Sequence, residues 1–444
     1  MKCDRFLLIA ALAAAAVSPA CAQSALTLRA GAAKVDITPK DLTGIVSVWA
    51  KPFDGVHDPI YARALVLDNG TTSAALVATD LVEYGDSTPV RERIAHESGI
   101  PVDHIIVCAS HDHNAPRGGP ITPGSSSAEG RPYSPPAYIQ FVDDQIVEAV
   151  RRAKASLQPA RFGIETGRAD INENRNAYNG KGWGGPDPDG PSDKTVWVVK
   201  FESLSGDPIA ILMNYAVHSI VAGPLNTLVT GDLAGAAERF VEKHYGDKVV
   251  ALWTMGPAGD QNPFYNMSVP EQGMDKDPAQ DKALAYEAMD ALGLVVGEEA
   301  IQAANRISHM TSTVRMEASE QVFSCDTVPQ RPRPAGAPSP FAPNPGFKET
   351  IPYPSSMKIH LNLIQLNQVA ITGVSGEVFT KIYWHLKKDS PLSNTFMVTM
   401  SNDRIGYIGD DASYDGPFRN ASVVRGCAEN GIVNGLVGMI EANQ

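Results

Sequence analysis

Short β-rich runs alternate with two long helical patterns along this chain, and this alternation constrains the fold more than any other feature. In residues 135–157 and 281–307, apolar side chains recur at helical spacing, as expected for helices that bury one face. Runs of strand-forming residues lie before, between and after these helices, at residues 62–68, 73–80, 104–110, 195–203, 208–218, 358–374 and 395–402. This mixture predicts an α/β fold (mixed α+β), in which mixed β-sheets are flanked by helices.

A proline-rich stretch is the one clear interruption of this pattern. Seven prolines lie between Pro329 and Pro345, and composition alone would favour a linker between domains. Candidate functional residues, described below, lie on both sides of the stretch. We therefore predict a Pro-rich loop at about residues 326–347 on a single domain that spans residues 23–444.

The N-terminus has the pattern of a secretory signal peptide. Residues 1–22 combine a basic start, an apolar stretch from Phe6 to Val17 and small residues before a cleavage site at Gln23. The apolar stretch is too short to cross a membrane. Lipid attachment at Cys21 is an alternative, although the residues before it match a lipobox poorly. We expect a secreted or periplasmic protein without a transmembrane segment.

Charge and cysteine content exclude two further classes of protein. The net charge is −13, without a long cluster of lysine and arginine, so nucleic acid is not expected as a partner. Signal cleavage would leave three cysteines, an odd number that excludes a fully paired disulfide framework. Cys108 lies in an apolar strand candidate and is expected to be a buried thiol. Cys325 and Cys427 then form the one plausible disulfide pair, although their spacing does not settle whether they bond.

Residues 107–116, VCASHDHNAP, predict an apolar strand that runs into a loop with two histidines. Side chains two residues apart in an extended segment point to the same side, so His111 and His113 can face one cavity. Another apolar strand candidate ends at His218. Nitrogen ligands on rigid strand ends, with one coordination position left open, suit a catalytic zinc ion. Single histidines are more often structural, and the pair alone leaves both interpretations open.

Short motifs follow one another in a characteristic order: AGAAKVDITP, GVHDPIYARALVL, ASHDHNAPRGG, NENRNAY, YAVHS, TGDLAG, PAGDQNP, GVSGEVFT and SNDRIGYIGDDASY. In this order, from about Ala30 to Tyr414, the sequence resembles the catalytic N-terminal domain of the neutral/alkaline, non-lysosomal ceramidase family. The third motif stands against the family's T-H-T-H-x-G-P element. The resemblance implies a ceramidase-like zinc hydrolase catalytic domain, without the C-terminal immunoglobulin-like domain of full-length ceramidases.

The resemblance also implies a role for each matching residue. The family's zinc ligands correspond here to His111, His218, Glu377 and Tyr407. The expected catalytic residues correspond to His113, Arg175 and Tyr414. Asp112, between the two histidines, replaces a threonine of the family and is expected to be structural.

These residues form a coherent set for amide hydrolysis. Two imidazoles and one carboxylate leave a divalent zinc with net positive charge, which brings a bound water towards ionisation near neutral pH. The resemblance implies that this hydroxide attacks the amide of an N-acyl, ceramide-like substrate to give fatty acid and sphingoid amine. His113 would pass a proton to the leaving amine, and Arg175 would stabilise developing negative charge. A lipid-like or other N-acyl small molecule is the expected substrate, with transient contact to a membrane surface.

Each site residue also has a structural interpretation. Arg175 can pair with a carboxylate such as Glu173, Glu377 can cap a following helix, and Tyr407 can be a core aromatic residue. Three aspartates can support turns or orient metal ligands; these are Asp80, Asp232 and Asp260.

Two departures from the family's pattern concern the substrate more than the metal. Asn262 stands where ceramidases carry a serine that has been proposed as a nucleophile, and an amide cannot attack a carbonyl group. After Tyr414 the family continues with a Y-E-G-A-S-T element, whereas this chain reads DGPFRNASVV. Two alternatives therefore stay open: a zinc hydrolase of another amide, ester or lactone, and a non-catalytic relative that binds lipid or metal.

Overall fold

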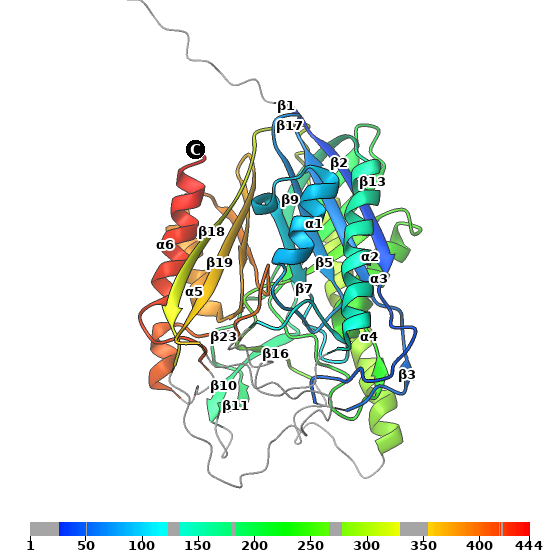
Figure 1. The fold of residues 1–444 in the computed structure, drawn as a ribbon, viewed down its shortest axis with the longest axis vertical. Helices are drawn as coiled ribbons and strands as arrows, with labels where there is room; N and C mark the ends of the chain where they lie inside the picture. Colours follow the sequence, from blue (N-terminus) through cyan, green and yellow to red (C-terminus); the bar gives the residue numbers. More distant parts are fainter. Residues whose placement is uncertain are drawn as a thin grey trace, which may run out of the picture.

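The computed structural model describes residues 26–49, 51–122, 134–178, 183–265, 278–328, 354–416, 418 and 421–444. The predicted signal peptide, residues 1–22, and the prolines of the predicted Pro-rich loop lie outside this part of the chain. The described part consists of mixed β-sheets with helices packed on their outer faces (Figure 1), which confirms the predicted fold class.

Three successive segments of the described chain fold into the same unit. In each unit, three antiparallel strands lead through a helix to a fourth strand parallel to the third, and a second helix follows. The first unit comprises β2 (Arg29–Asp36), β4 (Tyr61–Asp68), β5 (Ser73–Thr79), α1 (Thr88–Ser98), β7 (Ile105–Ala109) and α2 (Pro136–Ala155). The second comprises β9 (Gln158–Arg168), β12 (Thr195–Ser203), β13 (Pro208–Tyr215), α3 (Asp232–His244), β15 (Val250–Met255) and α4 (Pro278–Arg306). The third comprises β18 (Met316–Asp326), β19 (Ser356–Leu366), β20 (Val369–Val374), α5 (Thr380–Asp389), β22 (Asn394–Val398) and α6 (Ala428–Glu441).

The pairing of strands follows this repeat. The first and second units join into an eight-stranded sheet through two residue pairs between β2 and β9, Arg29 with Pro159 and Ala30 with Gln158. The third unit forms a separate four-stranded sheet. The parallel pair within each unit, β5 with β7, β13 with β15 and β20 with β22, is spanned by a helix, because a parallel connection needs a crossover.

One core lies between the sheets and three cores lie under the helices. Strands of all three units contribute to the central core, where Trp197 of β12 stacks on Phe396 of β22 with ring centroids 5.7 Å apart. The outer cores join α1 and α2 to the first unit, α3 and α4 to the second, and α5 and α6 to the third (Figure 1). Burial of each large apolar side chain contributes about 1.5–3 kcal/mol.

The ends of the third and fourth strands of all three units meet at one end of the molecule. After β22, Thr399 donates its N–H to Met255 at the end of β15, and Asn402 donates to Val107 of β7. After β7, His113 donates its N–H to Ser219, which follows β13. The short strands β16, β10, β11 and β23 lie at this lower end in Figure 1. Polar residues that follow these strands are therefore brought together from the whole chain.

The structure confirms the predicted buried thiol and answers the question that the cysteine spacing left open. Cys325 of β18 forms a disulfide with Cys427, immediately before α6, with a Cα–Cα distance of 5.8 Å. Cys108 is buried and unpaired. Among the described residues, no helix has the length and apolar character needed to span a membrane.

Candidate metal centre

His111, His218 and Glu377 come together at the end where the units meet, one from each unit. His111 follows β7, His218 follows β13, and Glu377 begins the short strand β21 (Glu377–Val378) after β20. Strand β21 pairs in parallel with β23 (Tyr407–Ile408), which places Glu377 directly opposite Tyr407. All three clustered side chains are almost completely buried. The helix-capping alternative for Glu377 does not apply, because Phe379 occupies the N-cap of α5.

The two histidines of the HDH motif meet by a different route from the one predicted. His111 has a φ of 65°, so the extended alternation that would put residues 111 and 113 on one side has already ended. The imidazoles still meet, with 3.2 Å between the Nε2 atoms of His111 and His113. A left-handed backbone at a non-glycine residue costs of order 1–3 kcal/mol and is concentrated at functional sites.

Three atoms of this cluster are hydrogen-bond acceptors that face one another. Oε2 of Glu377 lies 3.2 Å from Nε2 of His218 and 3.4 Å from Nε2 of His111. Nδ1 of His111 contacts the Val82 carbonyl at 2.6 Å, and Nδ1 of His218 contacts the Gln261 carbonyl at 2.9 Å. Since a carbonyl only accepts, each Nδ1 carries the hydrogen, and each neutral ring keeps its lone pair on Nε2.

This arrangement fits a bound zinc ion. Two ligands that each lie about 2.0–2.1 Å from a tetrahedral zinc are separated by roughly 3.3 Å, which matches the separations of 3.2 and 3.4 Å at Glu377. The carbonyl contacts of the two Nδ1 atoms are the partners that orient metal-binding histidines. Lone pairs pointing at a carboxylate oxygen repel one another unless a cation lies between them. The donor set therefore suits zinc at His111, His218 and Glu377.

His113 differs from the other two histidines in its second nitrogen. The ligand atoms of His111, His113 and His218 all lie within 4.8 Å of one another, so the three imidazoles are an alternative metal-binding group. However, the buried Nδ1 of His113 has no hydrogen-bond partner among the described residues. No carbonyl group of the described residues holds this Nδ1 as carbonyl groups hold those of His111 and His218, so His113 is better suited to moving a proton than to ligating a metal.

Electrostatics keep the cluster in the protonation states that bind metal. Burial alone would raise the pKa of Glu377, but the neighbouring Arg404 guanidinium and His111 hold that pKa well below its usual range. Burial and the nearby Arg175 lower the pKa of His218 to about 3. Burial, followed by the neighbouring His111 and His218, also holds the pKa of His113 well below its usual value. At neutral pH, Glu377 is therefore an ionised carboxylate, and His113 and His218 are neutral imidazoles.

Arg175 joins the cluster to Tyr407. It lies on β10 (Asn172–Tyr178), and its Nη2 donates to the Tyr407 hydroxyl at 2.9 Å and to the Gly259 carbonyl at 3.0 Å. The same Nη2 lies 3.2 Å from Nε2 of His218. Burial raises the pKa of Tyr407 despite the nearby guanidinium. The structure thus brings Arg175 and Tyr407 to the histidines.

The segment that contains Asp260 and Asn262 accepts hydrogen bonds from Arg175. Asn262, in β16 (Gln261–Pro263), accepts a hydrogen bond from Nη1 of Arg175 at 3.2 Å. The Asp260 carbonyl accepts the Arg175 backbone N–H at 2.9 Å, and its carboxylate accepts from the backbone and hydroxyl of Thr380 at 3.0 and 2.9 Å. Burial raises the pKa of Asp260 to about 6. Asp260 therefore holds the backbone of Arg175 and the start of α5, and its predicted role in orienting metal ligands stays a prediction.

Tyr414 lies apart from these contacts. It is part of a short 3₁₀ helix, Asp411–Asp415, and its hydroxyl donates to the Val423 carbonyl at 2.7 Å. Within the described ranges, no hydrogen bond connects Tyr414 to the histidines, Glu377 or Arg175. Its catalytic role stays a prediction.

The sequence analysis missed Arg404 and Glu83. Arg404 donates to Oε1 of Glu377 at 2.5 Å and pairs with Glu83 at 3.0 Å, and both residues are buried. Arg404 lies within the motif SNDRIGYIGDDASY, yet nothing in that motif indicates its partner. A pair formed by residues so far apart in the chain leaves no local pattern.

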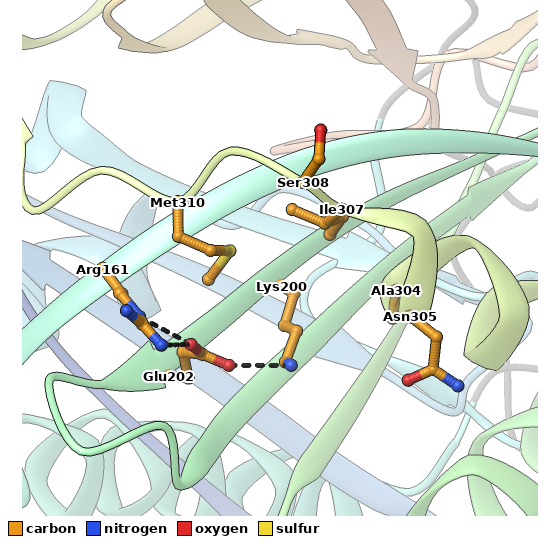
Figure 2. Close-up of a pocket in the computed structure, with 8 residues that line it drawn as sticks. All are labelled: Arg161, Lys200, Glu202, Ala304, Asn305, Ile307, Ser308 and Met310. Carbon is orange, nitrogen blue, oxygen red and sulfur yellow. Dashed lines mark hydrogen bonds and ion pairs between the residues drawn. The ribbon is translucent and has the colours of Figure 1, made fainter.

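A separate cavity lies away from the histidine cluster. Its volume is about 450 Å³, and residues of β9, β12, the end of α4 and the following loop line it, including Arg161, Lys200 and Glu202. Figure 2 shows the carboxylate of Glu202 held between Arg161 and Lys200. Because β12 runs antiparallel to β13, Glu202 near its end lies at the opposite end of the sheet from His218. Two cations and one carboxylate leave this group with a net charge of +1, and the lining residues include none of the three clustered histidines.

Comparisons with known proteins identify the same family as the motifs. A profile of the N-terminal part of neutral/alkaline non-lysosomal ceramidase matches residues 29–281. Neutral ceramidase A of Dictyostelium discoideum is 27% identical over 210 residues, which cover 43% of this chain and 28% of that protein. Neutral ceramidase of Pseudomonas aeruginosa is 26% identical over 257 residues, which cover 54% of this chain and 38% of that protein. The aligned parts thus span less than half of these relatives.

A solved structure supports the fold over nearly the whole chain. The crystal structure of neutral ceramidase from Pseudomonas aeruginosa superposes with a TM-score of 0.72 at 18% identity, covering 94% of this chain and 74% of that one. The likeness extends past the profile match to the part of the chain that contains Glu377 and Tyr407. With a profile match over more than half of its length, this chain belongs to the neutral/alkaline non-lysosomal ceramidase family.

Proposed function

We propose that this protein is a zinc-dependent amidohydrolase that cleaves the amide bond of an N-acyl, ceramide-like lipid. One observation carries the proposal: Oε2 of Glu377 faces the lone pairs of His111 and His218 at 3.4 and 3.2 Å. Membership of the ceramidase family supports the substrate class. Hydrolysis adds one water across the C–N bond and gives a fatty acid and a sphingoid amine.

The residues fit zinc as their metal. His111, His218 and Glu377 would hold the ion, and Tyr407, opposite Glu377 in the β21–β23 pair, would complete the set. A zinc ion held by nitrogen and carboxylate ligands lowers the pKa of water and polarises carbonyl oxygens.

The remaining residues supply binding and proton transfer. The guanidinium of Arg175, fixed by the Gly259 carbonyl and the Tyr407 hydroxyl, presents positive charge beside His218 and would stabilise an oxygen that becomes negative during amide cleavage. His113 is neutral at pH 7 and its Nδ1 is unpaired among the described residues. It would take a proton and deliver it to the nitrogen of the leaving amine. Trp49 lies beside His113, with ring centroids 5.6 Å apart.

Because residue 262 is an asparagine, the proposed reaction does not pass through an acyl-serine intermediate at this position. Its side-chain oxygen accepts from Arg175, and an amide cannot form an ester with the acyl group. The carbonyl carbon is therefore attacked by water rather than by residue 262. Removing Asn262 should leave the reaction largely intact.

We also propose that the protein is exported and that residues 1–22 are removed. The basic, apolar and small-residue regions of this segment support the proposal. Mass spectrometry of protein recovered from the medium or periplasm tests it. A mature N-terminus at Gln23 is expected, and recovery of the full chain from the cytoplasm would contradict export.

Incubation of the purified protein with a short-chain ceramide tests the enzymatic proposal. Sphingosine release is followed by mass spectrometry, with and without a zinc chelator, and the metal content is measured in parallel. Release that stops with chelator and returns with added zinc is expected. Protein that carries zinc but cleaves short soluble amides, esters or lactones instead of ceramide would overturn the substrate and leave the metal site intact. Chelator-insensitive release would overturn the role of zinc.

A further inference from the structure

Four buried residues of alternating charge form a continuous chain that ends at the metal-facing carboxylate. Nε of Arg117 lies 3.0 Å from Oε1 of Glu83, and Oε2 of Glu83 lies 3.0 Å from Nη1 of Arg404. Nη2 of Arg404 then donates to Oε1 of Glu377 at 2.5 Å. The side chains of all four are at most 6% exposed. Both oxygens of Glu83 and Oε1 of Glu377 therefore each contact an arginine. Oε2 of Glu377 instead faces the histidines.

The two carboxylate oxygens of Glu377 therefore have different partners. Arg404 occupies Oε1, and Oε2 faces the Nε2 atoms of His111 and His218. A carboxylate that rotates about its last bond exchanges these oxygens. The charge-assisted hydrogen bond from Arg404 opposes that rotation.

The repeat of the fold explains where Glu83 comes from. In the first unit, β6 (Glu83–Tyr84) pairs in parallel with β8 (Arg117–Gly118), and Glu83 stands opposite Arg117. In the third unit, β21 pairs in parallel with β23, and Glu377 stands opposite Tyr407. Both short pairs follow the parallel strands of their unit. Glu83 therefore occupies in the first unit the position that Glu377 occupies in the third, and it binds an arginine where Glu377 faces the histidines.

The same short segment also holds a second member of the cluster. The Val82 carbonyl accepts from Nδ1 of His111 at 2.6 Å, while the adjacent Glu83 holds Arg404. One dipeptide thus fixes the orientation of His111 directly and that of Glu377 through Arg404. Displacement of Glu83 would disturb two proposed ligands, His111 and Glu377, together.

We propose that Glu83 and Arg404 are positioning residues that hold Oε2 of Glu377, and with it the cluster, in the geometry that binds the metal. The inference rests on the proposed function only in requiring that His111, His218 and Glu377 bind zinc. It does not require that the substrate is a ceramide. The effect of Glu83 and Arg404 passes through Glu377, because Arg404 donates to Oε1 of Glu377 and Glu83 pairs with Arg404.

Zinc affinity tests this proposal independently of activity. The dissociation constant of zinc is measured by competition with a chromogenic chelator, and the absorption spectrum of the cobalt-substituted protein reports the ligand geometry. Glu83→Gln removes the charge and keeps the shape, and Arg404→Met removes the donor to Glu377. Loss of such supporting contacts typically weakens metal binding 10–100-fold. We therefore expect the dissociation constant of zinc to rise about 10-fold in Glu83→Gln and about 100-fold in Arg404→Met. The cobalt spectrum should change in both variants.

Arg91→Met is the matched control, because Arg91 also pairs with a glutamate, Glu320 at 3.0 Å, and this glutamate is not a proposed metal ligand. This variant should lower the melting temperature without changing zinc affinity or the cobalt spectrum. If Arg404→Met does not fold, the same measurements are made on Glu83→Gln and Arg404→Lys. Arg404→Lys keeps a positive charge near Glu377, so it should lose less zinc affinity than is expected for Arg404→Met. Wild-type zinc affinity and an unchanged cobalt spectrum in Glu83→Gln and Arg404→Lys would overturn the proposal. A wild-type protein that binds no zinc would instead overturn the metal site itself.

Discussion

Two clusters of glutamate, arginine and histidine lie between the layers of this protein, and they use the carboxylate differently. At Glu320 of β18, Oε1 accepts from Nδ1 of His360 at 2.8 Å and Oε2 accepts from Arg91 at 3.0 Å. At Glu377, Oε1 accepts from Arg404, whereas Oε2 faces the Nε2 atoms of two histidines whose Nδ1 atoms contact carbonyl groups. The first carboxylate is satisfied by N–H donors, and the second meets lone pairs.

The difference separates a structural cluster from a binding site. Around Glu320, Asn362 and Asn402 add further amide donors at 3.3 Å, so the cluster joins α1, β18, β19 and the segment after β22 without any ligand. Around Glu377, the facing acceptor atoms have the arrangement that a bound cation would stabilise. Residue types alone do not distinguish the two clusters; the direction of each hydrogen does.

The largest expected effect is the loss of zinc from the Glu377 cluster. His218→Ala removes one of the two nitrogen ligands, so bound zinc should be lost and kcat/KM should fall by about 10³-fold or more, equivalent to ~4 kcal/mol. His360→Ala in the Glu320 cluster is the control; it should lower stability by about 1–3 kcal/mol and leave zinc in place. Metal analysis and steady-state kinetics decide. Full zinc content in His218→Ala would remove this residue from the site.

Arg175→Met is the next largest prediction. The variant removes the cation beside His218 but no proposed ligand, so kcat should fall by about 10²-fold while zinc is retained. The Glu320 cluster supplies the control, because Arg91→Met also removes a buried guanidinium and should leave kcat unchanged. Kinetics on protein with confirmed zinc content test this. Equal losses in the two variants would mean that Arg175 acts through stability.

The Glu320 cluster should show itself in the pH dependence of stability. Burial would raise the pKa of Glu320, but His360 and Arg91 lower it to about 2, from 4.5 in the unfolded chain. Because the folded pKa is the lower one, this stabilisation is present above about pH 4.5 and is lost as the pH falls towards 2. Since Glu320 is only partly shielded from solvent, the contribution is about 1–2 kcal/mol. Denaturant unfolding of the metal-free protein at pH 7 and pH 3 measures the change in the free energy of unfolding. In Glu320→Gln, the difference between the two pH values should be smaller by this contribution.

The sequence could reveal the local features of this fold but not its repeat. Strands β4, β5 and β7 and helices α2 and α4 appear at the positions that apolar periodicity predicts, because that periodicity is set by nearby residues. The three units share no recognisable sequence, since many apolar residues fit each strand position. Their equivalence lies in the order and pairing of strands, which is a property of the folded backbone.

The sequence likewise identified some residues of the candidate site and missed others. Motif order identified His111, His218 and Glu377, and the structure brings these three residues together. Glu83 and Arg404 were not found, because a buried ion pair across two units has no periodic or motif signature. The meeting of His111 with His113 was predicted from extended geometry, yet it depends on the left-handed backbone at His111.

The smallest expected effect concerns Asn262, and it tests whether single neutral contacts matter in either cluster. Asn262→Ala removes one acceptor for Arg175, whose Nη2 keeps its contacts with the Gly259 carbonyl and the Tyr407 hydroxyl. We expect kcat/KM to change by less than about 3-fold, equivalent to ~0.6 kcal/mol. Asn362→Ala is the counterpart in the Glu320 cluster and should leave kcat/KM unchanged. Steady-state kinetics on both variants, with Asn262→Ser as a further comparison, measure the effect. A loss above about 100-fold in Asn262→Ala alone would show that this amide binds the substrate, and the Glu377 cluster would then depend on residue 262 as well as on its charged groups.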